Sequence, residues 1–315
     1  MMAWVLSGLG LVILLLAGDA LVRGAVNLSL RLGVPALIVS LTIVAFGTSA
    51  PELLIAISAI KDNAPGIALG NVVGSNTANI LLVLGIPALL ATLHTSECNS
   101  RRNYLHMMAA TVLFIALAFS GDFTIADGLL LLIALGLVLA NAFREAYAHR
   151  RAGQEDDLEG IEDADPDMPY WRISIYLVLG MIGLPLGAGI LVENASMIAR
   201  TYGVSDTAIG LTLVAVGTSL PELATTLMAV MRRQADVAMG NVIGSNMFNL
   251  LAIIGIATWF GPIPVDPEFL RFDLWVMLGA SLLLMPFVFL GKDITRIWGV
   301  FLTGLYVVYI VVVLV

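Results

Sequence analysis

The sequence contains few of the residues that enzymes and transition-metal proteins use for their chemistry. Among 315 residues there are one cysteine, Cys98, and three histidines. A single cysteine excludes an internal disulfide framework and any cysteine-rich metal site. An intramembrane protease or transferase would need a nucleophile or metal signature such as His-Glu-x-x-His, and none occurs. We therefore expect a protein that is not an enzyme.

Charged residues are also scarce, at 12% of the chain, whereas hydrophobic residues make up 59% and the mean hydropathy is +0.98. That leaves too little polar surface for a soluble globule. Spanning a bilayer core takes about 20 mostly apolar residues, and nearly the whole chain divides into segments of that length. The sequence therefore predicts an all-α polytopic membrane protein whose main partner is the lipid bilayer.

We expect ten transmembrane helices, five on each side of a polar stretch. They cover residues 4–31, 35–60, 66–91, 104–121, 125–145, 171–200, 205–231, 236–259, 272–290 and 295–314. The chain then comprises a first five-helix repeat at 1–145, an acidic cytoplasmic linker at 146–170 and a second five-helix repeat at 171–315. Because each half has an odd number of spans, the second half enters the membrane from the opposite side, so the repeats are predicted to be inverted. The N-terminal run lacks the basic start of a signal peptide, and we expect it to be retained.

The basic residues predict which ends of the spans face the cytoplasm. If both termini lie outside, 12 of the 15 lysines and arginines fall at cytoplasmic ends, and the exceptions are Lys61, Arg200 and Arg271. The linker, with eight acids between Glu155 and Asp167, is then cytoplasmic. Its EF-hand-like spacing fails at the twelfth position, which is Pro166. We expect a solvated linker, with a weak regulatory calcium contact as the alternative.

One stretch of the chain occurs twice, 170 residues apart. Residues 41–52 and 211–222 are identical at nine of twelve positions, and each contains Gly-Thr-Ser-x-Pro-Glu. A second motif, Gly-Asn-x-x-Gly-Ser-Asn, follows each copy at 70–76 and at 240–246. Both pairs have the same offset, so the chain consists of two copies of one unit.

Each copy of the first motif carries a glutamate, Glu52 or Glu222, near the middle of a predicted span. A carboxylate there costs about 2.5 to 3.5 kcal/mol on insertion scales, so it must face a polar cavity, a partner or a cation. No span offers a lysine, arginine or histidine at matching depth, since the histidines fall in or beside loops. We therefore expect the partner of these acids to come from outside the chain.

The prolines of the first motif predict a break in each helix. Pro51 and Pro221 lack an N–H, and each ring displaces the carbonyl of the glycine four residues earlier. We expect the breaks between Ala45 and Pro51 and between Ala215 and Pro221. Freed carbonyls at membrane depth are tolerated where they line a cavity or meet a ligand, and paired broken helices mark the binding sites of transporters.

The second motif begins a stripe of amide and hydroxyl side chains on one face of an apolar helix. Its members are Asn71, Ser75 and Asn79 on the third span, with Asn241, Ser245 and Asn249 at matching places on the eighth. Hydrogen bonds between helices would explain a single stripe of this kind. Its doubling beside a glutamate favours coordination of an ion.

The predicted donors are carboxylate, hydroxyl, amide and backbone carbonyl oxygens. Such hard donors suit calcium, sodium or magnesium, whereas zinc, copper and iron favour imidazole or thiolate. Magnesium keeps much of its water and requires a rigid octahedron, so a kinked, flexible cage favours calcium. Sodium ions that use the same oxygens would compete with calcium, and competition at one alternating-access site is antiport.

The first span also carries two charges, Asp19 and Arg23, at i,i+4 spacing. We expect them to pair with each other near the cytoplasmic end. A pair across the two repeats, between Arg23 and Glu193, is the alternative. None of these residues is assigned to the ion site.

The two doubled motifs resemble those of the calcium/cation antiporter superfamily, and most closely those of its prokaryotic sodium/calcium exchanger branch. The resemblance covers the whole chain. It implies an antiporter in the prokaryotic plasma (inner) membrane that uses the sodium gradient to expel calcium. It also implies ions bound at the midplane between the second, third, seventh and eighth spans. In the mechanism we expect, the first and sixth helices slide across the other eight.

The resemblance further implies a set of metal ligands. Glu52 and Glu222 are the calcium carboxylates, and Thr48 and Thr218 give shared carbonyl oxygens. The other ligands implied are the hydroxyls of Ser49, Ser219, Ser75 and Ser245, the carbonyls of Ala45 and Ala215, and the side chains of Asn79 and Asn249. Some relatives carry an aspartate at the place of Asn249, so this site has one fewer possible charge. No cofactor and no nucleic acid is expected; the bound ions are the transported Ca²⁺ and Na⁺, and the protein is expected to work as a monomer.

Other functions remain as alternatives. Proton-coupled relatives tend to carry a glutamate near the Gly-Asn pair, but 72–74 and 242–244 contain no acid. Sodium coupling is therefore favoured, and a calcium/proton exchanger is the second candidate. A passive cation channel would share the oxygen ligands but would need no inverted doubling.

Overall fold

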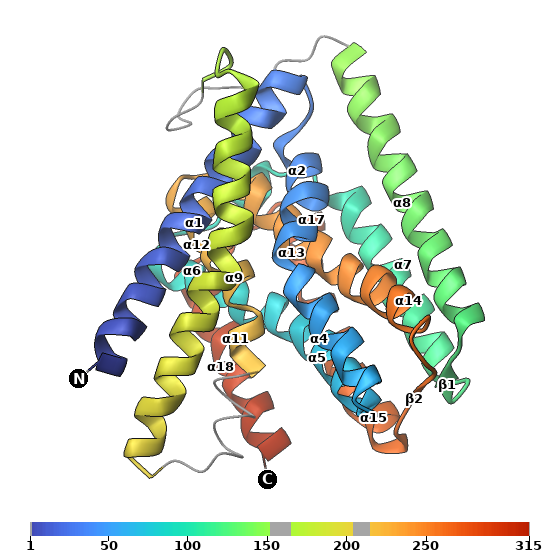
Figure 1. The fold of residues 1–315 in the computed structure, drawn as a ribbon. Helices are drawn as coiled ribbons and strands as arrows, with labels where there is room; N and C mark the ends of the chain where they lie inside the picture. The colour runs from blue at the N-terminus through green and yellow to red at the C-terminus, as the bar shows by residue number, and fades with distance from the viewer. Residues whose placement is uncertain (1, 152–164, 204–214, 315) are drawn as a thin grey trace.

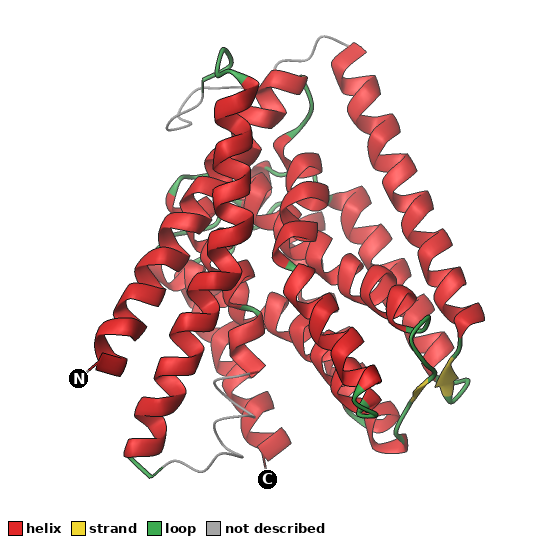
Figure 2. Ribbon diagram, viewed as in Figure 1, coloured by secondary structure: helices red, strands yellow, loops and turns green. Residues whose placement is uncertain are grey.

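The computed structural model describes residues 2–151, 165–203 and 215–314, and these are almost entirely helical (Figure 2). The first half contains α1 (Met2–Leu32), α2 (Ala36–Val39), η1 (Ser40–Val44), α3 (Ala45–Thr48), α4 (Ala50–Lys61), α5 (Pro65–Ala78), η2 (Asn79–Val83), α6 (Gly85–Leu90), η3 (Thr95–Glu97), α7 (Arg101–Ala118), β1 (Asp122–Phe123) and α8 (Ile125–Arg151). The second half contains α9 (Tyr170–Thr201), α11 (Ala215–Thr218), α12 (Leu220–Met231), α13 (Ala235–Met247), η5 (Phe248–Ile253), α14 (Ile254–Ala257), β2 (Ile263–Pro264), α15 (Pro267–Arg271), α16 (Asp273–Leu283), α17 (Met285–Phe289) and α18 (Arg296–Leu314). The elements η1, η2 and η5 are π-helical.

Seven helical stretches of the described chain are long and apolar enough to cross a membrane, and the bent pair Ala36–Thr48 and Ala50–Lys61 is an eighth candidate. The expected span at 104–121 corresponds to α7, whose first turns are polar, with Arg101, Arg102 and His106. The expected span at 205–231 is described only from residue 215. The structure is that of an all-α polytopic membrane protein, and the count of ten spans stays a prediction.

The helix ends differ from the expected ones mainly at α8. It continues to Arg151, past the expected end at 145, because 146–151 contains two alanines and two arginines, which favour a helix, and has its basic residues at the C-terminal end. The linker residues 152–164, with most of the acidic run and the EF-hand-like spacing, lie outside the described part of the chain.

Two helical segments form the centre of the molecule. The most apolar window of Ala235–Ala257 is completely buried and that of Pro65–Leu90 is 83% buried, whereas the other candidate spans are only 17–39% buried. Both central segments carry the Gly-Asn-x-x-Gly-Ser-Asn motif. The remaining spans surround them and expose their apolar faces, as expected for contact with lipid.

The long helices α1 and α9 pack side by side at one edge of the bundle (Figure 1). Their contact is close because glycines meet backbone: a Cβ on Gly10 would lie 2.7 Å from the Leu191 nitrogen, and one on Gly187 would lie 2.7 Å from the Leu14 nitrogen. Small residues at such contacts allow helices in a membrane to approach closely. The first and sixth predicted spans therefore form a closely packed pair.

Asp19 connects this pair to the rest of the bundle. The expected local pair is confirmed, with Arg23 Nε donating to Asp19 Oδ2 at 2.9 Å. The other carboxylate oxygen, Oδ1, accepts from Nε of Arg232, the C-cap residue that follows α12. Spacing along the chain does not predict this second contact, since the two residues are 213 positions apart.

Short antiparallel bridges join loops of the bundle. Phe123 pairs with Ile263 in the β1–β2 ribbon, and Leu93 pairs with Ile294 in an isolated bridge. Beside the second bridge, the Ser96 backbone N–H donates to Asp293 at 3.0 Å. Burial opposes ionisation of Asp293, but the contacts with Ser96 and His94 outweigh it and hold the pKa of this carboxyl below its usual value.

Candidate functional site

Each copy of the first motif contains the predicted helix break. In the first half the break lies at Ser49, with φ −88° and ψ 1°, and α4 turns away from the preceding helical segment by 42°. In the second half Ser219 has nearly the same backbone angles, φ −89° and ψ 4°. The proline stands second in the helix that follows each serine, where its missing N–H costs nothing. Both predicted breaks are confirmed.

The two glutamates lie in the first turns of the helices that begin after the breaks. Glu52 and Glu222 are each only 1% exposed. The positive end of a helix dipole favours an acid at this position, but does not balance a full buried charge. Ser49 Oγ donates to Glu222 Oε1 at 3.3 Å, so the break in the first half contacts the acid of the second.

Side chains of α13 surround the end of α3. The hydroxyl of Thr48 lies 3.4 Å from Asn241 Oδ1 and 3.4 Å from Ser245 Oγ. Asn241 in turn donates from Nδ2 to the backbone carbonyl of Glu222 at 3.2 Å and to Thr226 Oγ1 at 3.0 Å. Asn241 thus makes hydrogen bonds between helices through its Nδ2.

The asparagines that end the two stripes are also buried, each 1% exposed. Asn79 donates from Nδ2 to Asn246 Oδ1, and Asn249 donates from Nδ2 to Asn76 Oδ1, both at 3.0 Å. Their own carbonyl oxygens, Oδ1, have no hydrogen-bond partner among the described residues. Each stripe thus ends in a buried oxygen that is available to a ligand.

Five buried oxygens of predicted site residues lack a hydrogen-bond partner in the described structure. They are Oε2 of Glu52, Oε2 of Glu222, Oδ1 of Asn79, Oδ1 of Asn249 and Oγ of Ser219. Leaving a buried acceptor unpaired costs about 1–3 kcal/mol, more for a charged group. With the two carboxylates ionised, all five accept and only the serine can also donate, so the species that satisfies them must be positive or a donor.

The remaining predicted residues lie on the same elements. Ser75 is buried one turn before Asn79 on α5, and Thr218 ends α11. Ala215 is the first residue of α11. The carbonyl of Ala45, an implied ligand, accepts from the Ser49 N–H at 3.0 Å and from Thr48 Oγ1 at 3.2 Å. For Ala45 to bind an ion, the Thr48 hydroxyl would have to turn away.

Three residues of this region were missed by the sequence analysis: Asn76, Asn246 and Thr226. The first two end the Gly-Asn-x-x-Gly-Ser-Asn motif and recur at the same offset, so the signal that identified their neighbours was present for them as well. Thr226 has no counterpart, because the equivalent residue of the first half is Ala56.

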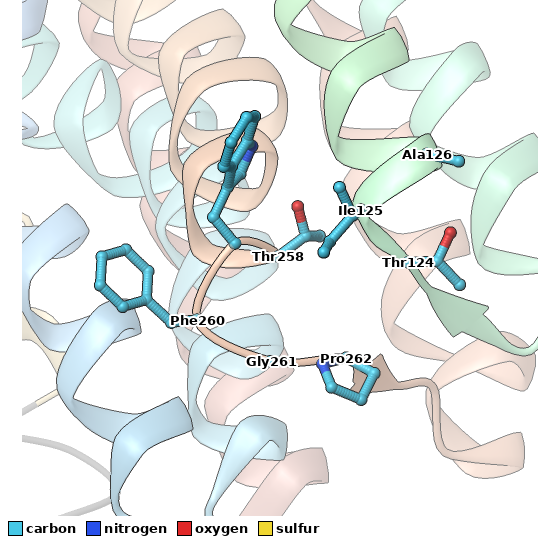
Figure 3. A pocket seen from close by; sticks show the side chains of 8 residues that line it. Thr124, Ile125, Ala126, Thr258, Phe260, Gly261 and Pro262 are labelled. Atoms are coloured by element: carbon cyan, nitrogen blue, oxygen red, sulfur yellow. The ribbon is translucent and has the colours of Figure 1, made fainter.

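One cavity of the described structure lies beside the β1–β2 ribbon, away from this site. It has a volume of about 580 Å³, and among its lining residues Thr258 lies close to Ile125 at the start of α8, whereas Phe260 points away from α8 (Figure 3). Its lining is mostly apolar and includes none of the predicted ligands. It therefore provides no ion site.

Comparison with known proteins identifies the family. Residues 2–144 and 173–315 match the family described as sodium/calcium exchanger protein. The chain belongs to the sodium/calcium exchanger family. This membership confirms the resemblance to the calcium/cation antiporter superfamily. It makes the chain a multi-pass membrane protein and a cation antiporter, from a family of exchangers rather than of enzymes.

Individual relatives of this exchanger match over nearly their whole length. It is 34% identical over 336 residues to the sodium/calcium exchanger MaX1 of Methanosarcina acetivorans, covering 96% of each chain. It is 31% identical over 312 residues to the inner membrane protein YrbG of Escherichia coli K12, covering 98% of this chain and 96% of that one. Among solved structures, the sodium-calcium exchanger NCX_Mj soaked with 2.5 mM Na⁺ and 1 mM Sr²⁺ superimposes with a TM-score of 0.83. The match has 30% identity and covers 99% of this chain and 98% of the other.

Proposed function

We propose that this exchanger moves calcium out of the cell in exchange for sodium, at one site between Glu52 and Glu222. The single observation that carries the proposal is the group of five buried, unpartnered oxygens on residues of both motif copies. Carboxylate, amide and hydroxyl oxygens suit calcium and sodium. Two relatives, MaX1 and NCX_Mj, are named as sodium/calcium exchangers.

Antiport follows from the charge of the site. Two buried carboxylates are neutralised by one divalent ion or by two monovalent ions, so an empty site is unfavourable. Since calcium and sodium would use the same oxygens, binding of one excludes the other. The twelve residues predicted from the family remain our proposed ligands. We also propose that the protein works as a monomer and needs no cofactor.

We further propose ten spans in two inverted repeats, with both termini outside a prokaryotic inner membrane. In Figure 1 the two ends of the chain lie at the same end of the bundle. Asn76 and Asn246 are 170 residues apart, and each makes the same contact to the other, which supports a two-fold relation between the halves. Asn76 Nδ2 donates to the Asn246 carbonyl at 3.1 Å, and Asn246 Nδ2 donates to the Asn76 carbonyl at 3.4 Å.

Alternating access would require part of the molecule to move relative to the site. The pair α1 and α9 is suited to this role because its two helices pack closely on each other and expose much of their surface. The central segments, together with α4 and α12, carry the acceptor oxygens and would stay fixed. Sliding of α1 and α9 would then open the site to one side of the membrane at a time.

The proposal is tested in everted membrane vesicles loaded with sodium and diluted into sodium-free buffer with radioactive calcium. We expect calcium uptake that collapses when a sodium ionophore is added. Glu52→Gln and Glu222→Gln should each abolish it, because a neutral amide removes half of the charge that holds a divalent ion. Uptake that survives both substitutions would refute the site. Uptake that follows a pH gradient and ignores sodium would select the calcium/proton exchanger.

A further inference from the structure

Four asparagines form a closed group at the centre of the molecule. Asn76 and Asn79 come from the α5–η2 segment, and Asn246 and Asn249 come from the α13–η5 segment. None of the four is more than 2% exposed. Each therefore depends on protein groups, or on a bound ion, for its hydrogen bonds.

Two members of this group are fixed by backbone. Asn76 Nδ2 donates to the Asn246 carbonyl, and Asn246 Nδ2 donates to the Asn76 carbonyl. A backbone carbonyl can only accept, so it determines which end of each carboxamide faces it. The oxygens of Asn76 and Asn246 must therefore point the other way.

Those two oxygens in turn orient the other two asparagines. Asn246 Oδ1 accepts from Asn79 Nδ2 and Asn76 Oδ1 accepts from Asn249 Nδ2, both at 3.0 Å. A carboxamide that uses its nitrogen on one side presents its oxygen on the other. This is why Oδ1 of Asn79 and Oδ1 of Asn249 are the buried ends without a partner.

We infer that Asn76 and Asn246 are positioning residues, which prevent Asn249 and Asn79 from turning their NH₂ groups toward the ion. The inference rests on the proposed function, because it assigns a role within the same site. A carboxylate has two equivalent oxygens and needs no such control. A neutral amide does, since a flip replaces an acceptor with a donor that repels a cation.

Asn76→Leu tests the arrangement at Asn249, one of the two equivalent places in the group. Leucine has nearly the same shape but leaves Asn249 without its acceptor. We expect the apparent affinity of purified protein for Ca²⁺, measured by calorimetry, to fall about tenfold, with a smaller change in the maximal uptake rate. Asn246→Leu should act in the same way through Asn79.

A double-substitution cycle separates positioning from general support of the fold. If Asn76 acts through Asn249, Asn76→Leu should weaken Ca²⁺ binding by no more than about twofold when Asn249→Ala is already present. Asn249→Asp, combined with Asn76→Leu, should restore binding, because either oxygen of the carboxylate can face the ion. Equal losses in the presence and absence of Asn249→Ala would overturn the inference.

Thr77→Val is the matched control. Thr77 is buried on the same helix next to Asn76, but its hydroxyl donates to the Val73 carbonyl of its own helix at 3.0 Å. It should leave Ca²⁺ affinity within about twofold. If Asn76→Leu and Asn246→Leu lower only the unfolding temperature and leave Ca²⁺ affinity unchanged, the inference is wrong and the four amides only hold the helices together. Ca²⁺ binding is measured without a sodium gradient, so this outcome can be distinguished from a failure of the proposed sodium-coupled transport.

Discussion

The two serines at the helix breaks have equivalent backbone but different surroundings. Ser49 donates to Glu222 Oε1, whereas Ser219 Oγ is buried without a hydrogen-bond partner in the described chain. The first hydroxyl therefore stabilises the protein before any ion binds. The second gains its contact only if an ion or another ligand is present.

These surroundings predict different effects of removing each hydroxyl. Ser49→Ala should lower both the unfolding temperature of the ion-free protein and its Ca²⁺ affinity, because a hydrogen bond to a charged group contributes about 1.5–3 kcal/mol. Ser219→Ala should lower Ca²⁺ affinity about tenfold but leave the ion-free unfolding temperature unchanged or slightly raised. Thermal unfolding and calorimetry on the purified variants measure both quantities. A loss of ion-free stability in Ser219→Ala would show that its hydroxyl is used within the protein.

Single residues of the site were predictable where a local rule applied. Two mid-span acids without basic neighbours indicated Glu52 and Glu222, and the prolines indicated both breaks. The role of Asn76 was not predictable, because spacing along a helix does not tell which of two nearby amides faces backbone and which faces the cavity. The two hydrogen bonds that the Ala45 carbonyl accepts were not predictable from the break alone, since they depend on how the helix turns at Ser49 and on the rotamer of Thr48.

Among the elements, α1 and α12 are joined by the contact between Asp19 and Arg232. The side chains are 19% and 12% exposed, so this pair is well shielded from water. Arg23, at 32% exposure on the same turn as its partner, contributes less because exposed i,i+4 pairs are weak. If α1 moves along α12 during transport, the contact with Arg232 must be broken and remade in each cycle.

Asp19→Asn therefore should change the turnover rate more than ion binding. We expect the maximal uptake rate to change by about threefold or more, and Ca²⁺ affinity by less than about twofold, because Arg232 lies at the opposite end of α12 from Glu222, about 15 Å along the helix. Arg23→Gln is the control and should change neither quantity by more than about twofold. Equal effects of the two substitutions on turnover would argue against movement at this contact.

At the scale of the whole molecule, the doubled motif was sufficient to predict two related halves. Eight of the ten expected spans correspond to candidate spans of the structure, counting the bent pair as one, and most ends agree within three residues. The packing of α1 on α9 and the bridge from Leu93 to Ile294 were not predictable, since both join segments that are distant in sequence. Hydropathy locates spans; it does not determine which spans touch.

The inverted relation of the halves is open to a direct test at two equivalent residues. Asn63 and Arg233 are separated by 170 positions, and both are exposed. They follow α4 and α12 with left-handed backbone, φ 57° and φ 56°, so the two turns are copies of one another. With ten spans and both termini outside, Asn63 lies outside the cell and Arg233 lies in the cytoplasm.

In a Cys98→Ser background, Asn63→Cys should react with a membrane-impermeant maleimide added to intact cells. Arg233→Cys should react only after the membrane is made permeable. The reason is that an odd number of spans separates the two turns in an inverted repeat and an even number in a parallel one. Labelling of both cysteines from the same side would contradict the inversion, and with it the assignment of α11 and α12 to a single span.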